Sequence, residues 1–261
     1  MAKIPRTLWV VKVGSNLLTG ENGVNRVLIA ALARQIHALR RRGCATVMVS
    51  SGAISAGMAA TGLRQRPTER AGLQACATIG QPKLMAAYAA AFKKYEMHAA
   101  QILVTSWDLD SRKVCDNLKV TLNELIARGD SVPIFNENDA LSFEELEMLN
   151  RFGDNDRLSA HVAALLGADR LVILSDVAAL YTTPDCTGER IGRVREVNEK
   201  IMSYAGRSRN ERSVGGMISK LETAKRMLAA KIPMVIASGR VKDILLKIHR
   251  RENVGTWFES V

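Results

Sequence analysis

Short apolar runs alternate with longer stretches of helical periodicity along this chain of 261 residues. The runs are continuous and rich in branched residues, as buried strands are. They lie at 8–13, 45–50, 99–105, 131–136, 170–175 and 233–238, and a last strand is expected in GTWFES near the end. The stretches with helical periodicity lie at 24–42, 72–95, 116–128, 156–166, 216–230 and 241–248. This alternation predicts an α/β protein: a three-layer αβα sandwich with a mostly parallel central sheet.

Composition agrees with one globular domain, because 47% of the residues are hydrophobic and 24% are charged. We find no repeat or linker and expect a single domain over 1–261, with an N-terminal lobe at about 1–165 and a C-terminal lobe at about 166–261. The formal net charge of +11 favours anionic partners such as nucleotides, phosphates or acidic metabolites. Because the basic residues are dispersed and do not alternate with aromatic ones, we do not expect nucleic-acid binding.

The spacing of the cysteines and the residues at the start of the chain indicate the cellular compartment of the protein. Cys44, Cys76, Cys115 and Cys186 lie far apart, without the spacing of a zinc site or a redox pair. No apolar leader opens the chain, and no apolar run is long enough to cross a bilayer. We therefore expect reduced thiols, a cytoplasmic protein and no contact with membranes.

Ligands in folds of this class bind beyond the carboxyl ends of the strands, and glycine-rich motifs fall there. KVGSN closes the first strand and puts Lys12 beside Gly14, which suits a phosphate group. Taken alone, this motif is more often a turn glycine beside a surface lysine. VSSGAISAG follows the second strand and opens a helix, whose N-terminus favours anions. VGGMISK opens another helix, with Lys220 early in it.

Polar clusters form the remaining motifs. NEND at 136–139 follows a strand, and FGDND at 152–156 precedes a helix. Asn and Asp are also common turn and cap residues, so Asp156 could serve only as a helix cap. Two such clusters around one loop favour a polar site that binds an amino acid or water around Mg²⁺. ILSDV with ALYT follows the strand at 170–175.

Taken in order, KVGSN, VSSGAISAG, NENDALS, FGDNDRLSA, ILSDVAALYT and VGGMISKLETA resemble the glutamate 5-kinases of the amino acid kinase superfamily, over about 9–258. The resemblance implies four residues with catalytic roles, which are Lys12, Lys220, Asp154 and Asp156. It implies a glutamate pocket in the N-terminal lobe, formed by Ser51, Gly52, Asp139 and Asn155. It implies nucleotide contacts from Lys12, Gly14, Ser175, Asp176, Tyr181, Ser213, Val214, Gly215, Gly216, Met217, Ile218, Ser219 and Lys220.

The same resemblance implies the chemistry and the partners. The substrates would be ATP and L-glutamate, with Mg²⁺ bound mainly through ATP phosphates and water, and the product would be L-glutamyl 5-phosphate on the route to proline. Family members form dimers or tetramers, are inhibited by proline, and in many cases carry a C-terminal PUA domain beyond the point where this chain stops. A glutamate side chain is ionised at neutral pH, so no general base is required.

Two departures from the family pattern concern the nucleotide. The loop that usually has the sequence GTGGM is SVGGM here, and Ala179 stands where the family has a turn glycine. Both leave the reaction class intact but bear on nucleotide affinity and preference. The alternatives are another superfamily kinase, acting on acetylglutamate, aspartate, carbamate or UMP, or a catalytically silent ligand-sensing or RNA-associated protein.

Overall fold

A computed structural model of the chain describes residues 7–20, 23–141, 155–206 and 216–260. One sheet runs through it, with the strand order β10-β12-β11-β7-β1-β4-β6-β5. In that order, the strands are Arg193–Val194, Thr256–Phe258, Met234–Ser238, Arg170–Ser175, Thr7–Val13, Cys44–Val49, Ser131–Glu137 and His98–Val104. Every pairing is parallel except that of β11 with β12. The predicted α/β class and mostly parallel sheet are confirmed.

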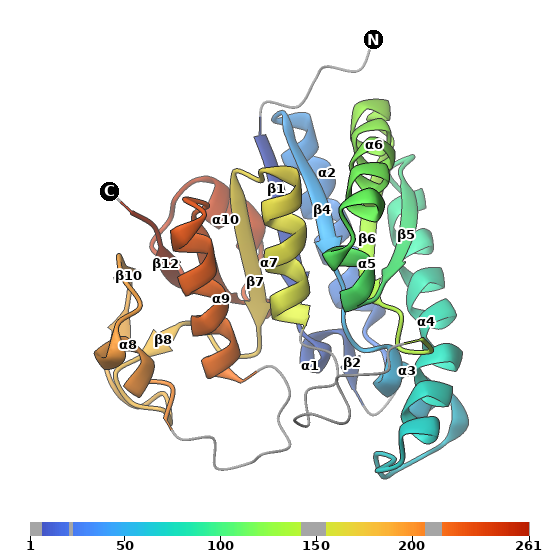
Figure 1. Cartoon of the computed structure of the whole chain (residues 1–261), viewed down its shortest axis with the longest axis horizontal. Coiled ribbons are helices and arrows are strands. Elements are labelled where there is room, and N and C mark those ends of the chain that lie inside the picture. The colour runs from blue at the N-terminus through green and yellow to red at the C-terminus, as the bar shows by residue number, and fades with distance from the viewer. Residues whose placement is uncertain (1–6, 21–22, 142–154, 207–215, 261) are drawn as a thin grey trace.

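Helices cover both faces of this sheet (Figure 1). On one face lie α2 (Arg26–Arg41), α4 (Arg70–Lys93) and α10 (Ile244–His249), and on the other lie α6 (Arg112–Arg128), α7 (Asn155–Leu166) and α9 (Met217–Ala229). Because strand side chains alternate, β1 sends Val10 into one core cluster and Val11 and Val13 into the other. This two-sided burial explains why the strands appear in the sequence as unbroken apolar runs.

Several short elements were not among the expected ones. They are α1 (Ser15–Leu18), α5 (Ser106–Asp110) and α8 (Glu199–Ser203), and the hairpins of β2 (Thr19–Gly20) with β3 (Gly23–Val24) and of β8 (Leu180–Tyr181) with β9 (Arg190–Ile191). The motif at 49–57 does open a helix, α3 (Ala53–Thr61). The predicted bounds of the longer elements differ by a few residues, most at α6, which begins at Arg112 where residue 116 was expected.

The helices α3 and α4 approach each other unusually closely. A Cβ atom built on Gly57 would lie 1.8 Å from the carbonyl oxygen of Cys76, and one on Gly80 would lie 1.9 Å from that of Ala53. Side chains larger than hydrogen therefore cannot occupy these positions without separating the helices. The two glycines fix the N-terminal turn of α3 against the middle of α4.

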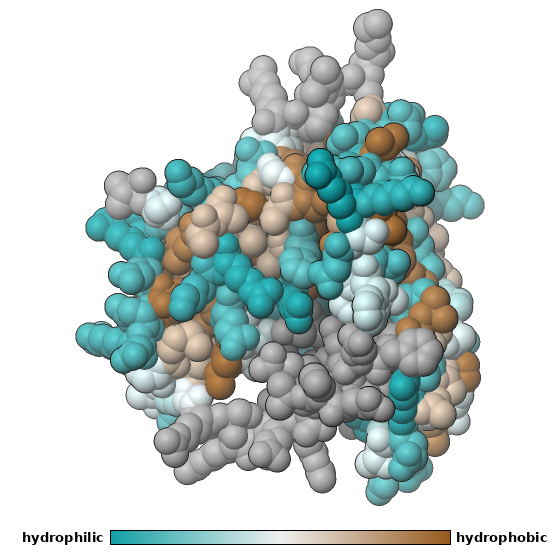
Figure 2. Space-filling model, viewed as in Figure 1, coloured by the Kyte–Doolittle hydropathy of each residue, from teal (hydrophilic) through white to brown (hydrophobic). Residues whose placement is uncertain are grey.

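The face shown in Figure 2 is mainly hydrophilic, with hydrophobic residues scattered between the polar ones. Within the described ranges, no helix is both long and apolar enough to cross a membrane.

Candidate active site

The carboxyl end of β1 lies at the centre of the sheet, where the chain changes direction. From β1 the chain continues to β4 on one side, and it returns later to β7 on the other side. Lys12 is paired in register with Val49 of β4 and with Ile173 of β7. Parallel sheets bind ligands in the crevice outside such a switch point. Lys12 is therefore central to the place where a ligand is expected.

Asp156 brings the two predicted lysines together. Its Oδ1 lies 2.7 Å from Nζ of Lys12, and its Oδ2 lies 3.2 Å from Nζ of Lys220. The side chains of Lys12 and Lys220 are 7% and 5% exposed, and that of Asp156 is fully buried. Lys12 comes from β1, Asp156 from the first turn of α7, and Lys220 from the first turns of α9. Residues 208 positions apart thus contact one carboxylate.

Burial and neighbouring charges act in opposite directions on these groups. Burial alone would raise the pKa of Asp156, but the charges of Lys12 and Lys220 outweigh it and hold that pKa below the usual value. Burial lowers the pKa of Lys220, and the charge of Lys12 lowers it further, while Asp156 partly offsets both effects. The three groups together carry one net positive charge, which favours an anion beside them.

Two glycines follow the central strands β1 and β4 closely. A Cβ atom on Gly14 would lie 4.0 Å from Nζ of Lys12, so the glycine leaves the approach to that ammonium clear. Gly52 caps α3 with a φ of 92°, in the left-handed region that side chains other than hydrogen disfavour. A glycine thus stands both beside the lysine and at the N-terminus of α3.

A buried chain of amides lies beside the charged cluster. Nδ2 of Asn155 donates to Oγ of Ser51 at 3.0 Å and to Oδ1 of Asn136 at 3.3 Å. All three residues are at most 7% exposed. Oδ1 of Asn155 is buried without a hydrogen-bond partner in the part of the chain that the structure describes. Since Asn155 directly precedes Asp156, the amide chain and the ion pairs share the first turn of α7.

On the other side of β1 lies the polar end of β7. Oγ of Ser175 donates to Oδ1 of Asp176 at 3.0 Å, and Nδ2 of Asn16 donates to Oδ2 of the same Asp176 at 2.9 Å. Burial raises the pKa of Asp176, but these two hydrogen bonds and the charge of Lys220 outweigh burial and hold that pKa below its usual value. Of the two residues predicted on the nucleotide side, Asp176 is thus favoured in its ionised form, and Ser175 is its hydrogen-bond donor.

The remaining predicted residues divide into two groups. Gly216, Met217, Ile218 and Ser219 form the start of α9, all half-buried, while Tyr181 lies in the β8–β9 hairpin opposite Arg190. Asp139 is 9% exposed and follows β6 by two residues, at the same edge of the sheet. The other four predictions, Asp154, Ser213, Val214 and Gly215, lie outside the described residues.

The sequence profile of the Amino acid kinase family matches residues 7–238. This chain belongs to the amino acid kinase family. Curated relatives named glutamate 5-kinase support the assignment: one from Thermus thermophilus is 43% identical over 253 residues, and one from Citrifermentans bemidjiense is 40% identical over 253. They cover 96% and 95% of this amino acid kinase, which spans 67% and 66% of their lengths. A third glutamate 5-kinase, from Clostridium perfringens strain 13, is 40% identical, and the match covers 95% of this chain and 94% of the length of that relative.

Sequence reasoning gave no individual role to three residues that this amino acid kinase brings to the site: Asn16 and Asn136 lie in the motifs KVGSN and NEND, and Gln81 was missed altogether. Asn16 holds Asp176, and Asn136 with Gln81 extends the amide chain. One feature of the sequence does point to a role for Gln81. Along α4 the buried apolar positions include Ala77 and Leu84, and Gln81 falls between them at helical spacing, so a polar residue occupies a core-facing stripe.

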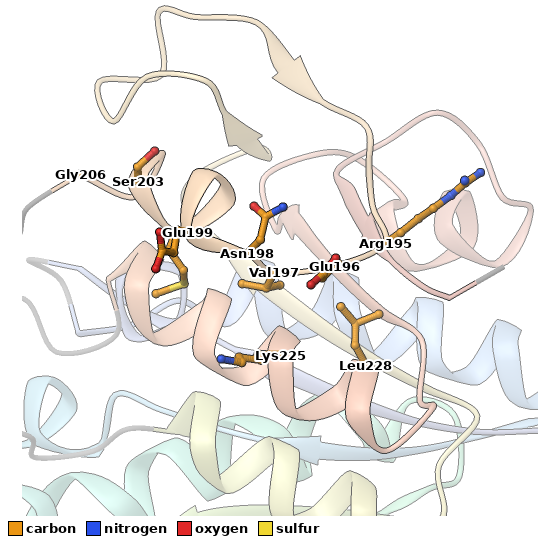
Figure 3. Close-up of a pocket in the computed structure, with 10 residues that line it drawn as sticks. Arg195, Glu196, Val197, Asn198, Glu199, Ser203, Gly206, Lys225 and Leu228 are labelled. Atoms are coloured by element: carbon orange, nitrogen blue, oxygen red, sulfur yellow. The ribbon is translucent and has the colours of Figure 1, made fainter.

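The kinase also has a hollow away from these residues. It has a volume of about 860 Å³ and lies between the segment after β10 and the outer side of α9 (Figure 3). Lys225 and Leu228 project into it from α9, and Asn198 and Glu199 face them from the other side. None of the described residues that were predicted for the site lines this hollow.

Proposed function

We propose that this chain transfers the γ-phosphoryl group of ATP to the side-chain carboxylate of L-glutamate, which yields L-glutamyl 5-phosphate and ADP. The observation that carries the proposal is the contact of Lys12 of β1 and Lys220 of α9 with the two oxygens of Asp156. The names of the relatives support glutamate as the acceptor. In this proposal the N-terminal lobe would hold the acceptor around β4 and β6, and the C-terminal lobe would hold the nucleotide around β7 and α9.

The chemical problem in this reaction is the approach of two anions. The γ-carboxylate has a reference pKa of about 4.3 and is ionised at neutral pH, so no base has to remove a proton. A carboxylate oxygen forms a bond to the γ-phosphorus while the bond to the bridging oxygen of ADP breaks, and ADP takes the electron pair. Positioning and charge neutralisation supply most of the catalysis in such a transfer. In our proposal, Lys12 and Lys220 neutralise the phosphoryl oxygens while Asp156 holds both ammonium groups in place.

The acceptor would bind along the amide chain. The N-terminus of α3, with Ser51 and Gly52, offers backbone N–H groups to a carboxylate. The substrate's ammonium group would find acceptors in Asp139 and in the Oδ1 atom of Asn155, which lacks a partner in the described part of the chain. These partners suit a free amino acid, whose charged ends need buried groups of opposite character.

The nucleotide would bind at the ends of β7 and α9. Gly14, Ser175, Asp176 and Tyr181 would contact it, together with the loop over 213–219. Mg²⁺ prefers phosphate oxygens and water as ligands, and the described residues contain no cluster of three His, Cys, Asp or Glu side chains. In our proposal the ion enters with ATP, because phosphate oxygens and water are its preferred ligands, and it would neutralise phosphate charge there.

The test is an acceptor screen with two readouts. ADP release is measured with ATP and Mg²⁺ in the presence of glutamate, acetylglutamate, aspartate, carbamate or UMP, and hydroxylamine traps any acyl phosphate as a hydroxamate. We expect ADP and hydroxamate in equal amounts with glutamate and a far lower rate with the others. ADP release without hydroxamate, or preference for another acceptor, contradicts the proposal. Adding proline to the glutamate reaction tests the expected inhibition.

A further inference from the structure

The amide chain beside the candidate site continues beyond Asn136 into α4. Nδ2 of Asn136 donates to Oε1 of Gln81 at 2.8 Å, and Oδ1 of the same Asn136 accepts from Asn155 at 3.3 Å. Asn155 in turn donates to Ser51. The chain thus joins α4, β6, α7 and the turn before α3, and each of its members is at most 8% exposed.

We propose that Gln81 is a positioning residue for the acceptor pocket, acting through Asn136 on Asn155 and Ser51. This inference rests on the proposed function, because it assigns the pocket to the phosphoryl acceptor. Gln81 need not touch the substrate. Its part is to set the direction of the hydrogen bonds in the residues that do.

The direction follows from the chemistry of the Asn136 amide. An asparagine amide has a donor end and an acceptor end of almost the same shape. The Oε1 atom of Gln81 accepts a hydrogen bond, so it selects the NH₂ end of Asn136. The carbonyl end must then face Asn155, where it accepts from Nδ2. Without Gln81, the Asn136 amide would be free to turn its NH₂ group toward the donor on Asn155, and the two donors would repel.

The stability of the fold gives no reason for a glutamine at this position. Gln81 faces the core from α4, and its Nε2 is buried without a hydrogen-bond partner in the described ranges. A buried donor without a partner costs about 1–3 kcal/mol, so an apolar side chain of similar volume would suit the core itself better. What the glutamine provides is the acceptor for Asn136. Polar residues that cost stability are expected where function needs them.

The place of Gln81 on α4 also makes it a firm anchor. The preceding residue, Gly80, lies against the backbone of Ala53, the first residue of α3. One turn of α4 therefore fixes the start of α3 through its backbone and the amide chain through its side chain. Both converge on Ser51 and Gly52, so a shift of α4 at this turn would be felt at the acceptor pocket.

Two substitutions separate positioning from packing. Gln81→Met keeps the volume and removes the acceptor. Gln81→Glu keeps an oxygen that accepts from Asn136 and removes only the Nε2 donor, which has no partner in the described part of the chain. The matched control is Gln35→Met. Gln35 is a buried glutamine of α2 whose amide accepts from N of Leu245 and donates to O of Ala31, away from the site.

The readouts are the KM for the acceptor, the KM for ATP and the melting temperature. We expect Gln81→Met to raise the acceptor KM on the order of tenfold with the KM for ATP within about twofold, because one oriented buried hydrogen-bond chain is lost. Gln81→Glu should restore most of the acceptor affinity although a buried carboxyl lowers its melting temperature. Gln35→Met should lower the melting temperature and leave both KM values unchanged.

An acceptor KM within about twofold of wild type in Gln81→Met, or a Gln81→Glu enzyme no better than Gln81→Met, would overturn the inference. The assay of the wild-type enzyme separates a failure of this inference from a failure of the proposed function. If wild type releases no ADP with glutamate, the proposed substrate is wrong, and the same variants are compared with whichever carboxylate the screen identifies. Equal KM values for that acceptor in Gln81→Met and wild type would then sink the inference separately.

Discussion

Both ends of the sheet hold cations, a half-buried one at the amino end and two buried ones at the carboxyl end, and their partners differ. At the amino end, the guanidinium of Arg170 on β7 lies over the rings of Trp9 and Trp257, 4.8 and 5.0 Å from their centroids. At the carboxyl end, the ammonium groups of Lys12 and Lys220 contact the oxygens of Asp156. Aromatic faces stabilise a cation with protein groups alone, so no ligand is needed there. Two ammonium groups on one carboxylate retain a net positive charge, which attracts an anionic ligand.

The difference separates a structural cluster from a site that is prepared for an anion. Burial and the nearby charge of Arg251 lower the pKa of Arg170. The two indole rings that contact Arg170 come from β1 and β12, the first and the last strand along the chain. Arg170 therefore ties the ends of the described chain together. Lys12 and Lys220 join β1, α7 and α9 through Asp156 at the opposite edge, where ligands bind.

The largest effect is expected from removing either lysine. Lys12→Ala and Lys220→Ala should each lower kcat by about 10²–10³-fold, because one group that neutralises the transferring phosphoryl is lost. The fold should change little, since the remaining lysine still contacts Asp156. Glutamate-dependent ADP release measures the rate, and circular dichroism the fold. Rates near wild type in either variant would remove that lysine from the proposed mechanism.

Replacing the shared carboxylate should affect both stability and the pH profile. Asp156→Asn leaves two buried ammonium groups without their counter-charge, at a cost of about 3–5 kcal/mol in the free energy of unfolding. In the wild type the pKa of Lys220 already lies below its usual value of 10.5. Activity, which requires the charged lysine, should therefore fall on the alkaline side with an apparent pKa below 10.5.

In Asp156→Asn that alkaline limb should move to still lower pH, because the aspartate charge raises the pKa of Lys220. The apparent value belongs to the pair of lysines together. A profile of kcat/KM against pH, taken on the residual activity, measures the shift. The same alkaline limb in both proteins would show that Asp156 does not control the charge of the lysines.

A smaller effect is expected for acceptor binding. Asp139→Ala should raise the KM for glutamate by about tenfold with a lesser change in kcat, since the residue is proposed to bind the substrate. Asp130→Ala is the matched control, because Asp130 lies just before β6 at the opposite edge and bonds to Arg128 and Ser131. If the two variants have the same KM as wild type, Asp139 does not belong to the pocket.

The smallest catalytic effect is expected at the amino end. Arg170→Met should lower the free energy of unfolding by about 1–2 kcal/mol through the loss of two cation–π contacts. It should leave kcat and both KM values within about twofold of wild type. Urea unfolding measures the first quantity, and the ADP assay the second. A large loss of kcat would mean that the two ends of the sheet are coupled.

Much of the framework follows from local sequence. The strand at 170–175 was predicted with its observed bounds, because a fully buried parallel strand is marked by an unbroken apolar run. The helix α5 was missed although its capping box, Thr105 with Asp108, is visible in the sequence. The antiparallel pairing of β12 with β11 could not be predicted, since strand partners are decided by the tertiary fold.

The candidate site likewise has features that the sequence indicated and others that it did not. One motif at a strand end contains Lys12, two motifs at helix starts contain Lys220 and Asp156, and the resemblance implied catalytic roles for all three. The contact of Gln81 with Asn136, 55 positions away, has no local signature apart from a polar residue in an apolar stripe. The distances that join Asp156 to both lysines likewise depend on how α7 and α9 pack, which the sequence does not state.

The central claim is that Lys12 and Lys220 act as a unit on one phosphoryl group. A double-mutant cycle tests it directly: glutamate hydroxamate formation is measured for Lys12→Ala, Lys220→Ala and the double variant. Residues that serve one transition state together are strongly non-additive, so the double variant should be only slightly slower than the worse single one. If the two losses multiply as independent factors, the lysines act separately and the account is wrong.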